Sequence, residues 1–322
     1  MLHYSDGESC IALPILLRDI EGTDFKDATS VYGYVGPIGN NIGDGFNNQK
    51  FRKFLDEFLM DNQIVSVFSR LHPFIDEQKI ILKNIGKIVP HGKVVNIDLT
   101  LNLDEQRKQY NRRLRTYINK ASKEYEIMDG NCYECLDIFI KMYCENMKRV
   151  DAKPSYFFGK TYFYEFLASS QINSELLVAK HKETGEIAGG ALFTKNGNTI
   201  QYHLSGVKSE FTRLNPIKLL IDHVRIEGTK QGFANFNLGG GLGGKTEDSL
   251  FYFKSGFSND YREFNTWQYI VDDVKYNDLL KQNLEMKRTS IDENSCYFPL
   301  YRHNVGPDDI EISQINCLAN DR

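Results

Sequence analysis

Residues 199–258 read TIQYHLSGVKSEFTRLNPIKLLIDHVRIEGTKQGFANFNLGGGLGGKTEDSLFYFKSGFS. Strand-type residues open the stretch, and a helix follows that carries Pro216 in its first turn, where proline is favoured. An aromatic strand at 233–238 then ends in a run of glycines. A strand, a helix and a second strand in this order predict part of an α/β domain.

The region just before this stretch predicts a three-stranded meander. Alternating segments at 175–181 and 187–194 lead into 199–204, with Asn196-Gly197 in the second turn. Asn-Gly between two strand-type segments is a strong signal for a tight hairpin turn.

The N-terminal half repeats the same order of elements. YGYVGP…FRKFLDEFLMDNQIVSVFSRL, within residues 32–71, and YHLSGV…PIKLLIDHVRIEGTKQGFANFNL, within 202–238, each give an aromatic strand end, a glycine turn, a helix and a strand. The other expected elements are strands at 10–20 and 94–101, a long basic helix capped by Asp104 and ending near Tyr125, and helices at 133–150 and 160–168.

These patterns predict an α/β protein with mixed sheets and two related domains in tandem. We place the domains at 1–125 and 126–322, and a duplicated unit of this kind commonly binds ligands at its groove. Because the chain enters a strand almost at once, at Leu2, we suspect that N-terminal residues are missing.

Composition narrows the function. The net charge of −4 argues against a general polyanion binder, so a nucleic-acid partner needs a local basic patch. One basic cluster could form such a patch: Arg107, Lys108, Arg112, Arg113, Arg115, Lys120 and Lys123. The alternative interpretation is that these residues form a solvated helix face. Neither a signal peptide nor an apolar run of spanning length is found, so we expect a cytoplasmic protein without a transmembrane segment.

Cys132 and Cys135 form an isolated CxxC in a stretch that reads as helical. A second pair that would complete a zinc site is missing, so we expect no metal. We interpret both cysteines as buried small apolar residues, with a redox or metal role as the alternative.

Several motifs together resemble the Fem (FemABX) family of acyl- and aminoacyltransferases. The first is an order of elements: a Tyr-rich strand, Arg213, Pro216, an amphipathic helix and Gly-Gly, followed by L-x-x-F-K-x-G-F at 250–257. The others are RRLRTYINKASK at 112–123 and MYCENMKRVDAKPSYFF at 142–158. The resemblance covers about residues 95–270. It implies tandem domains like those of GNAT acyltransferases, and transfer of an acyl or aminoacyl group from acyl-CoA or aminoacyl-tRNA to an amine. The implied acceptor is an amino sugar, a nucleotide-sugar or a peptidoglycan or polysaccharide precursor.

The resemblance also implies roles for two residues of the quoted stretch. Lys254 matches the family lysine that stabilises negative charge in the transition state, and an ammonium beside the carbonyl oxygen does so more strongly as charge builds up. The alternative is a surface lysine on an amphipathic helix. Arg213 corresponds to a substrate-phosphate contact, which suits the fixed fork of arginine donors; the alternative is a solvated loop arginine.

Other candidates come from their positions on the predicted strands. Tyr202, His203 and Ser205 lie where the last meander strand should reach the cleft, and a neutral imidazole at His203 could accept the amine proton. On the acceptor side, the candidates for stacking on a sugar or binding it are Tyr32, Tyr34 and Arg70.

The glycine run at 239–244 does not fit a phosphate-binding loop, because it lacks a Lys-Ser ending and is not followed by the expected helix pattern. The Q/R-x-x-G-x-G/A loop that holds CoA in GNAT enzymes is replaced by SGVKSEFTRLNP, which argues against CoA. Asn237 stands where the family usually has aspartate. Our main hypothesis is therefore a sequential acyltransferase, and the alternative is a non-catalytic Fem-like module that binds a glycan or RNA.

Overall fold

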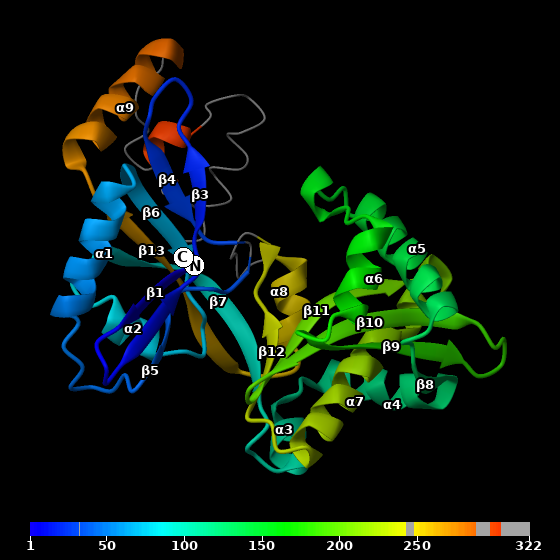
Figure 1. Cartoon of the computed structure of the whole chain (residues 1–322). Coiled ribbons are helices and arrows are strands. Elements are labelled where there is room, and N and C mark those ends of the chain that lie inside the picture. The colour runs from blue at the N-terminus through cyan, green and yellow to red at the C-terminus, as the bar shows by residue number, and fades with distance from the viewer. Residues whose placement is uncertain (32, 243–247, 288–296, 304–322) are drawn as a thin grey trace. The chain divides into compact units, whose positions relative to one another are not determined.

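The computed structural model describes residues 1–31, 33–242, 248–287 and 297–303. The chain divides into two compact α/β units (Figure 1). Unit 1 comprises Met1–Val94, Gly240–Asp248 and Arg262–Arg322, and unit 2 comprises Val95–Gly239 and Ser249–Tyr261.

Unit 2 is built on one mixed sheet in which the order is β7-β12-β11-β10-β9-β8. Its strands are β8 (Tyr125–Asp129), β9 (Asn173–His181), β10 (Ile187–Asn196), β11 (Thr199–Val207), β12 (Asn235–Gly239) and the last residues of β7 (Lys87–Asp98). Strands β9, β10 and β11 form the expected antiparallel meander, and β11 pairs with β12 in parallel.

Helices cover both faces of this sheet (Figure 1). They are α3 (Leu103–Gln109), α4 (Arg112–Glu124), α5 (Tyr133–Arg149), α6 (Lys160–Ala168), α7 (Pro216–Lys230) and α8 (Ser249–Ser255), with short 3₁₀ turns η1 (Pro154–Tyr156) and η2 (Ser209–Leu214). Alternation along β10 shows the two layers: Ala191 and Phe193 join the core under α4 and α7, whereas Leu192 joins the core under α5 and α6.

The prediction of one long basic helix between Asp104 and Tyr125 is wrong, because two helices, α3 and α4, occupy this stretch. Asn102, not Asp104, caps α3: its side chain accepts from the Glu105 N–H at 2.9 Å, and Glu105 completes the capping box. The backbone is extended at Tyr110 and Asn111, and Asn111 then caps α4 by accepting from the Leu114 N–H at 2.8 Å. A new cap inside a basic helical pattern restarts the helix in a new direction.

Unit 1 contains two sheets, with the order β1-β2-β5 in the small one. Its elements are β1 (Leu2–Ser5), β2 (Cys10–Leu13), β3 (Leu16–Asp19), β4 (Lys26–Thr29), β5 (Ile38–Asn40), α1 (Gln49–Asp61), β6 (Ile64–Arg70), α2 (Glu77–Ile81), part of β13 (Asp260–Ile270), α9 (Asp273–Lys287) and η4 (Leu300–Arg302). The single strand expected at 10–20 is two strands of different sheets, because Pro14 interrupts it and has no N–H for a ladder.

The predicted internal repeat is confirmed in the strand pairing. In unit 1, β3 and β4 are antiparallel, and the chain passes from β4 through α1 to the parallel β6. In unit 2, β10 and β11 are antiparallel, and the chain passes from β11 through α7 to the parallel β12. An antiparallel strand then follows in each: Thr266–Ile270 of β13 pairs with β6, and Val95–Asp98 of β7 pairs with β12.

The antiparallel neighbour of β6 is β13, from the C-terminal half of the sequence, and that of β12 is β7, from the N-terminal half. The boundaries of the units therefore do not lie at residue 125. Residues 95–125 belong to unit 2, and the chain from Arg262 onward belongs to unit 1. Element patterns in a sequence do not show which strands pair across a long separation, so the expected division at 125 did not include this exchange.

We expect a fragment of residues 1–125 to lack a cooperative thermal transition in far-ultraviolet circular dichroism, because it leaves the β6 edge open. It also loses Trp267, which is fully buried and donates from its indole N–H to the Ile85 carbonyl at 2.7 Å. A fragment of residues 95–261 contains all of unit 2 and should melt cooperatively. Cooperative melting of 1–125 together with a disordered 95–261 would contradict the exchange.

Candidate functional site

Strands β11 and β12 separate soon after they start to pair. Their parallel ladder joins Thr199–Gln201 to Asn235–Asn237, and the pairing described between the two strands ends there. Residues 202–207 of β11 therefore extend beyond the described pairing with β12, and we call the region where the two strands separate the slot. Backbone groups on the slot side of a splayed strand are available to a ligand, because no ladder partner occupies them.

A β-bulge lies where β11 leaves β12. Leu192 pairs with Leu204 and Phe193 pairs with Tyr202, so His203 is an extra residue on β11. Bulges bend a strand and change the direction of a side chain. Here the bulge places the three predicted residues of β11 in two different environments.

Tyr202 and Ser205 come together on the side of the main core of unit 2. The Tyr202 hydroxyl and Ser205 Oγ are 2.5 Å apart, and the Tyr202 ring lies 5.9 Å from the Phe193 ring. Burial raises the pKa of Tyr202 to about 12, so the phenol is neutral near pH 7. The pair is a short polar contact inside an apolar layer.

His203 lies instead among the aromatic residues of α6. Its Nε2 is 2.7 Å from the Tyr162 hydroxyl, and its ring stacks on Phe166 at 4.8 Å. Burial lowers the pKa of His203 to about 4, so the imidazole is neutral near pH 7. Tyr162 and Phe166 were missed in the sequence, although their spacing of four on α6 is the signal of a shared helix face.

A row of polar side chains lies at the base of the slot. The Asn237 amide donates to Gln201 Oε1 at 2.7 Å, and its own oxygen accepts from the Gly239 N–H at 2.8 Å. Asn96, opposite Asn237 on β7, donates to Asp260 at 2.7 Å, while its Oδ1 is buried with no hydrogen-bond partner in the described part of the chain. Asn237 thus donates to one strand neighbour and accepts from the backbone two residues later.

Lys254 is buried, with 8% of its surface exposed, so the alternative of a surface lysine is wrong. It lies in α8, whose end is attached to the α3–α4 junction: Asn111 donates its backbone N–H to the Gly256 carbonyl at 3.0 Å. Phe257 is fully buried and packs edge-on against Tyr110 at 5.4 Å. A Cβ at Gly256 would lie 2.9 Å from the Asn111 side chain amide, so a larger residue here would require that side chain to shift.

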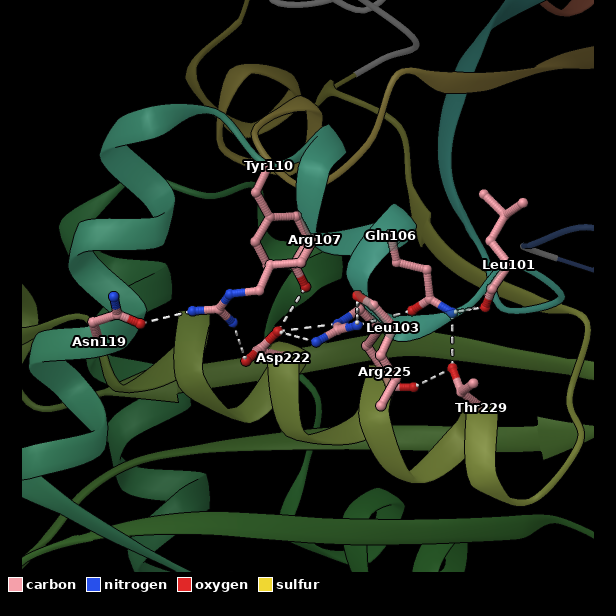
Figure 2. Close-up of polar contacts among 9 residues, drawn as sticks. All are labelled: Leu101, Leu103, Gln106, Arg107, Tyr110, Asn119, Asp222, Arg225 and Thr229. Carbon is pink, nitrogen blue, oxygen red and sulfur yellow. Dashed lines mark hydrogen bonds and ion pairs between the residues drawn. The ribbon is translucent and has the colours of Figure 1, made fainter.

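Tyr110 is in turn held by a buried ionic network (Figure 2). Its hydroxyl donates to Asp222 Oδ1 at 2.8 Å, and the same carboxylate accepts from Arg225 Nε at 3.0 Å. Burial, and then the Asp222 charge, raise the pKa of Tyr110 well above its usual value. Arg107 adds a longer contact to Asp222 at 3.4 Å, so this member of the predicted basic cluster is part of the core network.

The network also joins α3 to α7 along their length (Figure 2). Arg225 donates to Gln106 Oε1 at 3.0 Å, and Gln106 donates to Thr229 Oγ1 at 3.0 Å and to the Leu101 carbonyl at 2.7 Å. Each buried charge therefore has both an ionic and a hydrogen-bonding partner, which burial demands.

Arg213 is exposed in η2, away from the pairs on β11, and its carbonyl accepts from the Asn215 side chain at 2.8 Å. Asn215 has a left-handed backbone and makes no side-chain cap for α7. Nearby, Lys218 donates to Asn215 at 2.6 Å and lies 4.3 Å from the Tyr117 ring centre. Burial, and then Arg113, lower the pKa of Lys218.

The remaining basic cluster forms one exposed surface, which we call the α4 basic face. Its members, all exposed and without an ion pair among the described contacts, are Lys108, Arg112, Arg113, Arg115, Lys120 and Lys123. Exposed positive charge that is not held in ion pairs among the described contacts suits a phosphate-bearing partner.

In unit 1, Tyr34 belongs to a half-buried aromatic cluster, and Arg70 lies at its margin. The Tyr34 and His91 rings each lie 5.1 Å from Phe264, edge-on, and Tyr34 also lies edge-on to His72 at 6.1 Å. Burial, and then Arg70, lower the pKa of His91. No local pattern predicts His72, His91 or Phe264, because separate strands and loops bring them together.

Tyr32 lies outside the described residues, as do Gly243 and Gly244 of the glycine run. Across the ranges that the structure does describe, no group of three or more His, Cys, Asp or Glu side chains could hold a metal ion. In the same ranges, no helix combines the length and apolar character needed to cross a membrane.

Comparison with known proteins identifies the fold. No family model matches the chain, and no curated protein matches it in sequence. Among solved structures, FemX superimposes with a TM-score of 0.64 at 15% identity, covering 84% of this chain and 87% of FemX.

Two further structures agree. L-PGS from Bacillus licheniformis gives a TM-score of 0.55 at 18% identity, with 82% of each chain covered. A C-terminal domain from Agrobacterium fabrum, assigned to a lysylphosphatidylglycerol synthetase, gives 0.52 at 13% identity, covering 83% of this chain and 82% of that domain. The resemblance inferred from the sequence is therefore confirmed at the level of the fold, which this chain shares with FemX.

We expect Tyr110→Phe to lower the free energy of unfolding of unit 2 by about 2 kcal/mol, because it removes a buried hydrogen bond to a charged group. Urea unfolding followed by circular dichroism measures this. Tyr133→Phe is the matched control, because the Tyr133 side chain is 77% exposed and should change stability little. Equal stability of both variants would show that the network does not hold α3 to α7.

Proposed function

We propose that the protein is an acyltransferase that binds an acyl or aminoacyl donor in unit 2 and transfers the group to an amine. The observation that carries this proposal is the burial of Lys254 on α8. Lysine is rarely buried unless its charge has a task or a partner, and this lysine occupies the position that the Fem resemblance marks as catalytic.

In the proposed reaction, the neutral amine of the acceptor attacks the carbonyl carbon of the donor. The carbonyl oxygen becomes negative, and the Lys254 ammonium stabilises it. Backbone N–H groups of β11 beyond Gln201 add support in the slot. The C–N bond forms, the bond to the leaving oxygen or sulfur breaks, and the leaving group receives the proton that the amine loses. No covalent intermediate with the protein is needed.

His203 remains the predicted proton acceptor, and its contact with Tyr162 supports a role in which the proton moves onward from the imidazole. The imidazole is neutral at working pH, which is the form that accepts a proton, but burial also makes it a weak base, so a proton taken up there must pass on to the leaving group. Its Nε2 lies within hydrogen-bond distance of the Tyr162 hydroxyl, so in this proposal a proton that reaches Nε2 can move on through that hydroxyl. Water and the substrate itself are the alternative acceptors.

For the acceptor we propose an amino sugar, a nucleotide-sugar or a peptidoglycan precursor, bound in unit 1. The support is the half-buried cluster around Tyr34 and Phe264 with Arg70 at its margin. Aromatic faces stack on sugar rings, and the arginine fork matches phosphate or carboxylate.

For the donor, the α4 basic face favours aminoacyl-tRNA over acyl-CoA. Six exposed cations without ion pairs in the described contacts suit an RNA backbone. The sequence also lacks the loop with which GNAT enzymes hold CoA, as SGVKSEFTRLNP shows.

We expect Lys254→Met to lower kcat by about 10²-fold or more, because it keeps the buried volume and removes the charge that stabilises the oxyanion. Steady-state kinetics with the matched donor and acceptor measure this, and the thermal transition should stay close to that of the unchanged protein. Lys254→Ala should lose activity as well. Near-normal turnover of Lys254→Met would sink the assignment.

We expect the double variant Arg112→Gln, Arg115→Gln to weaken tRNA binding and to flatten its dependence on salt. Each lost phosphate contact should reduce the slope of log K against log salt by about 0.7 to 0.9. The matched control is Lys53→Gln, Lys79→Gln, which removes two exposed cations of unit 1 that are paired with carboxylates. An unchanged slope in the first variant contradicts the role of the basic face, and thermal protection by acyl-CoA alone would reverse the donor assignment.

A further inference from the structure

Two cysteines occupy the first turn of α5, where the function proposed above does not use them. Cys132 is the N-cap residue of the helix, and its Sγ accepts from the backbone N–H of Cys135 at 3.3 Å. Cys132 is exposed, whereas Cys135 is partly buried. The expectation that both are buried apolar residues is therefore wrong for Cys132.

The two thiols are close enough to interact directly. Burial first, and then a hydrogen bond to Cys132, raise the pKa of the Cys135 thiol to about 11. Residues three apart around a helical turn have Cβ atoms about 5–6 Å apart. Cys132 is the N-cap and has an extended rather than a helical backbone, so its Cβ is not held at that helical spacing. A disulfide needs about 3.5–4.5 Å between the two Cβ atoms.

The backbone around the pair is fixed by hydrogen bonds. The Cys132 N–H donates to the Gly130 carbonyl at 2.8 Å, and the Gly130 N–H donates to the Leu176 carbonyl on β9 at 2.7 Å. The Asn131 side chain accepts from the Leu176 N–H at 2.8 Å. These hydrogen bonds hold the N-terminus of α5 and keep the two sulfurs near each other. Each thiol is therefore present at a high effective concentration for the other.

We propose that Cys132 and Cys135 form a dithiol–disulfide site that is oxidised reversibly by a low-molecular-weight disulfide such as oxidised glutathione. The exposed Cys132 thiolate attacks the glutathione disulfide, forms a mixed disulfide and releases one glutathione thiolate. The Cys135 thiol then gives its proton to the released glutathione thiolate, attacks Cys132 Sγ and releases the second glutathione. The protein loses two electrons and two protons, and one glutathione disulfide becomes two thiols.

The surroundings favour a disulfide over a metal site. Within the described ranges, no further His, Cys, Asp or Glu completes a set of three potential ligands around the pair. Two thiolates alone leave a tetrahedral metal ion incompletely ligated.

The site also touches the contact between α5 and α6. Tyr133, between the two cysteines, stacks on Tyr164 of α6 at 5.4 Å, and the Tyr164 hydroxyl donates to Asp137 of α5 at 2.7 Å. Tyr162, on the same α6, contacts His203. Closing the disulfide therefore restrains the turn that positions α6 beside the bulge.

The test equilibrates the full-length protein in buffers of graded reduced-to-oxidised glutathione ratio, blocks free thiols with N-ethylmaleimide and maps the peptides by mass spectrometry. The peptide that contains both cysteines should lose the mass of two hydrogen atoms and escape alkylation as oxidised glutathione increases. Dithiothreitol should restore both alkylation sites.

Cys132→Ser and Cys135→Ser should each abolish this species, whereas Cys144→Ser should leave it unchanged. The proposal is overturned if both cysteines of the unchanged protein stay alkylated even with oxidised glutathione in large excess. It is equally overturned if Cys132 pairs with a cysteine other than Cys135. Peptide mapping of the unchanged protein decides the question even if a variant fails to fold.

Discussion

The arrangement of unit 2 depends on one buried carboxylate. Asp222 accepts from Tyr110 and Arg225 together, and a charge in the interior costs several kcal/mol unless it is paired in this way. By holding Tyr110, Asp222 fixes the junction at which α3 ends and α4 begins. That junction receives Gly256 and Phe257 at the end of α8, so an ion pair on α7 determines where Lys254 lies. The position of Lys254 and the stability of the helical layer therefore depend on the same contacts.

The bulge on β11 separates two chemical environments that neighbouring residues would otherwise share. Tyr202 and Ser205 enter the apolar layer under α4 and α7, whereas His203 enters the aromatic layer of α6. Burial moves the pKa of Tyr202 upward and that of His203 downward, so both groups are uncharged at neutral pH. The strand therefore carries neutral hydrogen-bonding groups on both of its faces at this pH.

Local patterns predicted local structure well. Alternation and an Asn-Gly turn were sufficient for the meander of β9, β10 and β11, because both act within a few residues. The break at Tyr110 and Asn111 was missed because helix-forming residues continue on both sides, and only the cap at Asn111 shows it. Lys254 could be selected from its motif, but its burial depends on α3, α4 and α8 meeting. The contact of His203 with Tyr162, and that of His91 with Phe264, join segments whose pairing leaves no local mark in the sequence.

The exchanged strands also set an order for folding during synthesis. Every residue of unit 2 has been made once Tyr261 has left the ribosome, so this unit can close its sheet at that point. Unit 1 begins at the N-terminus, yet Thr266 and its neighbours must pair with β6 before its sheet is complete. The part of the chain that is made first is therefore finished last. Until then the edge of β6 that β13 will cover is open, and an open strand edge can pair with other chains.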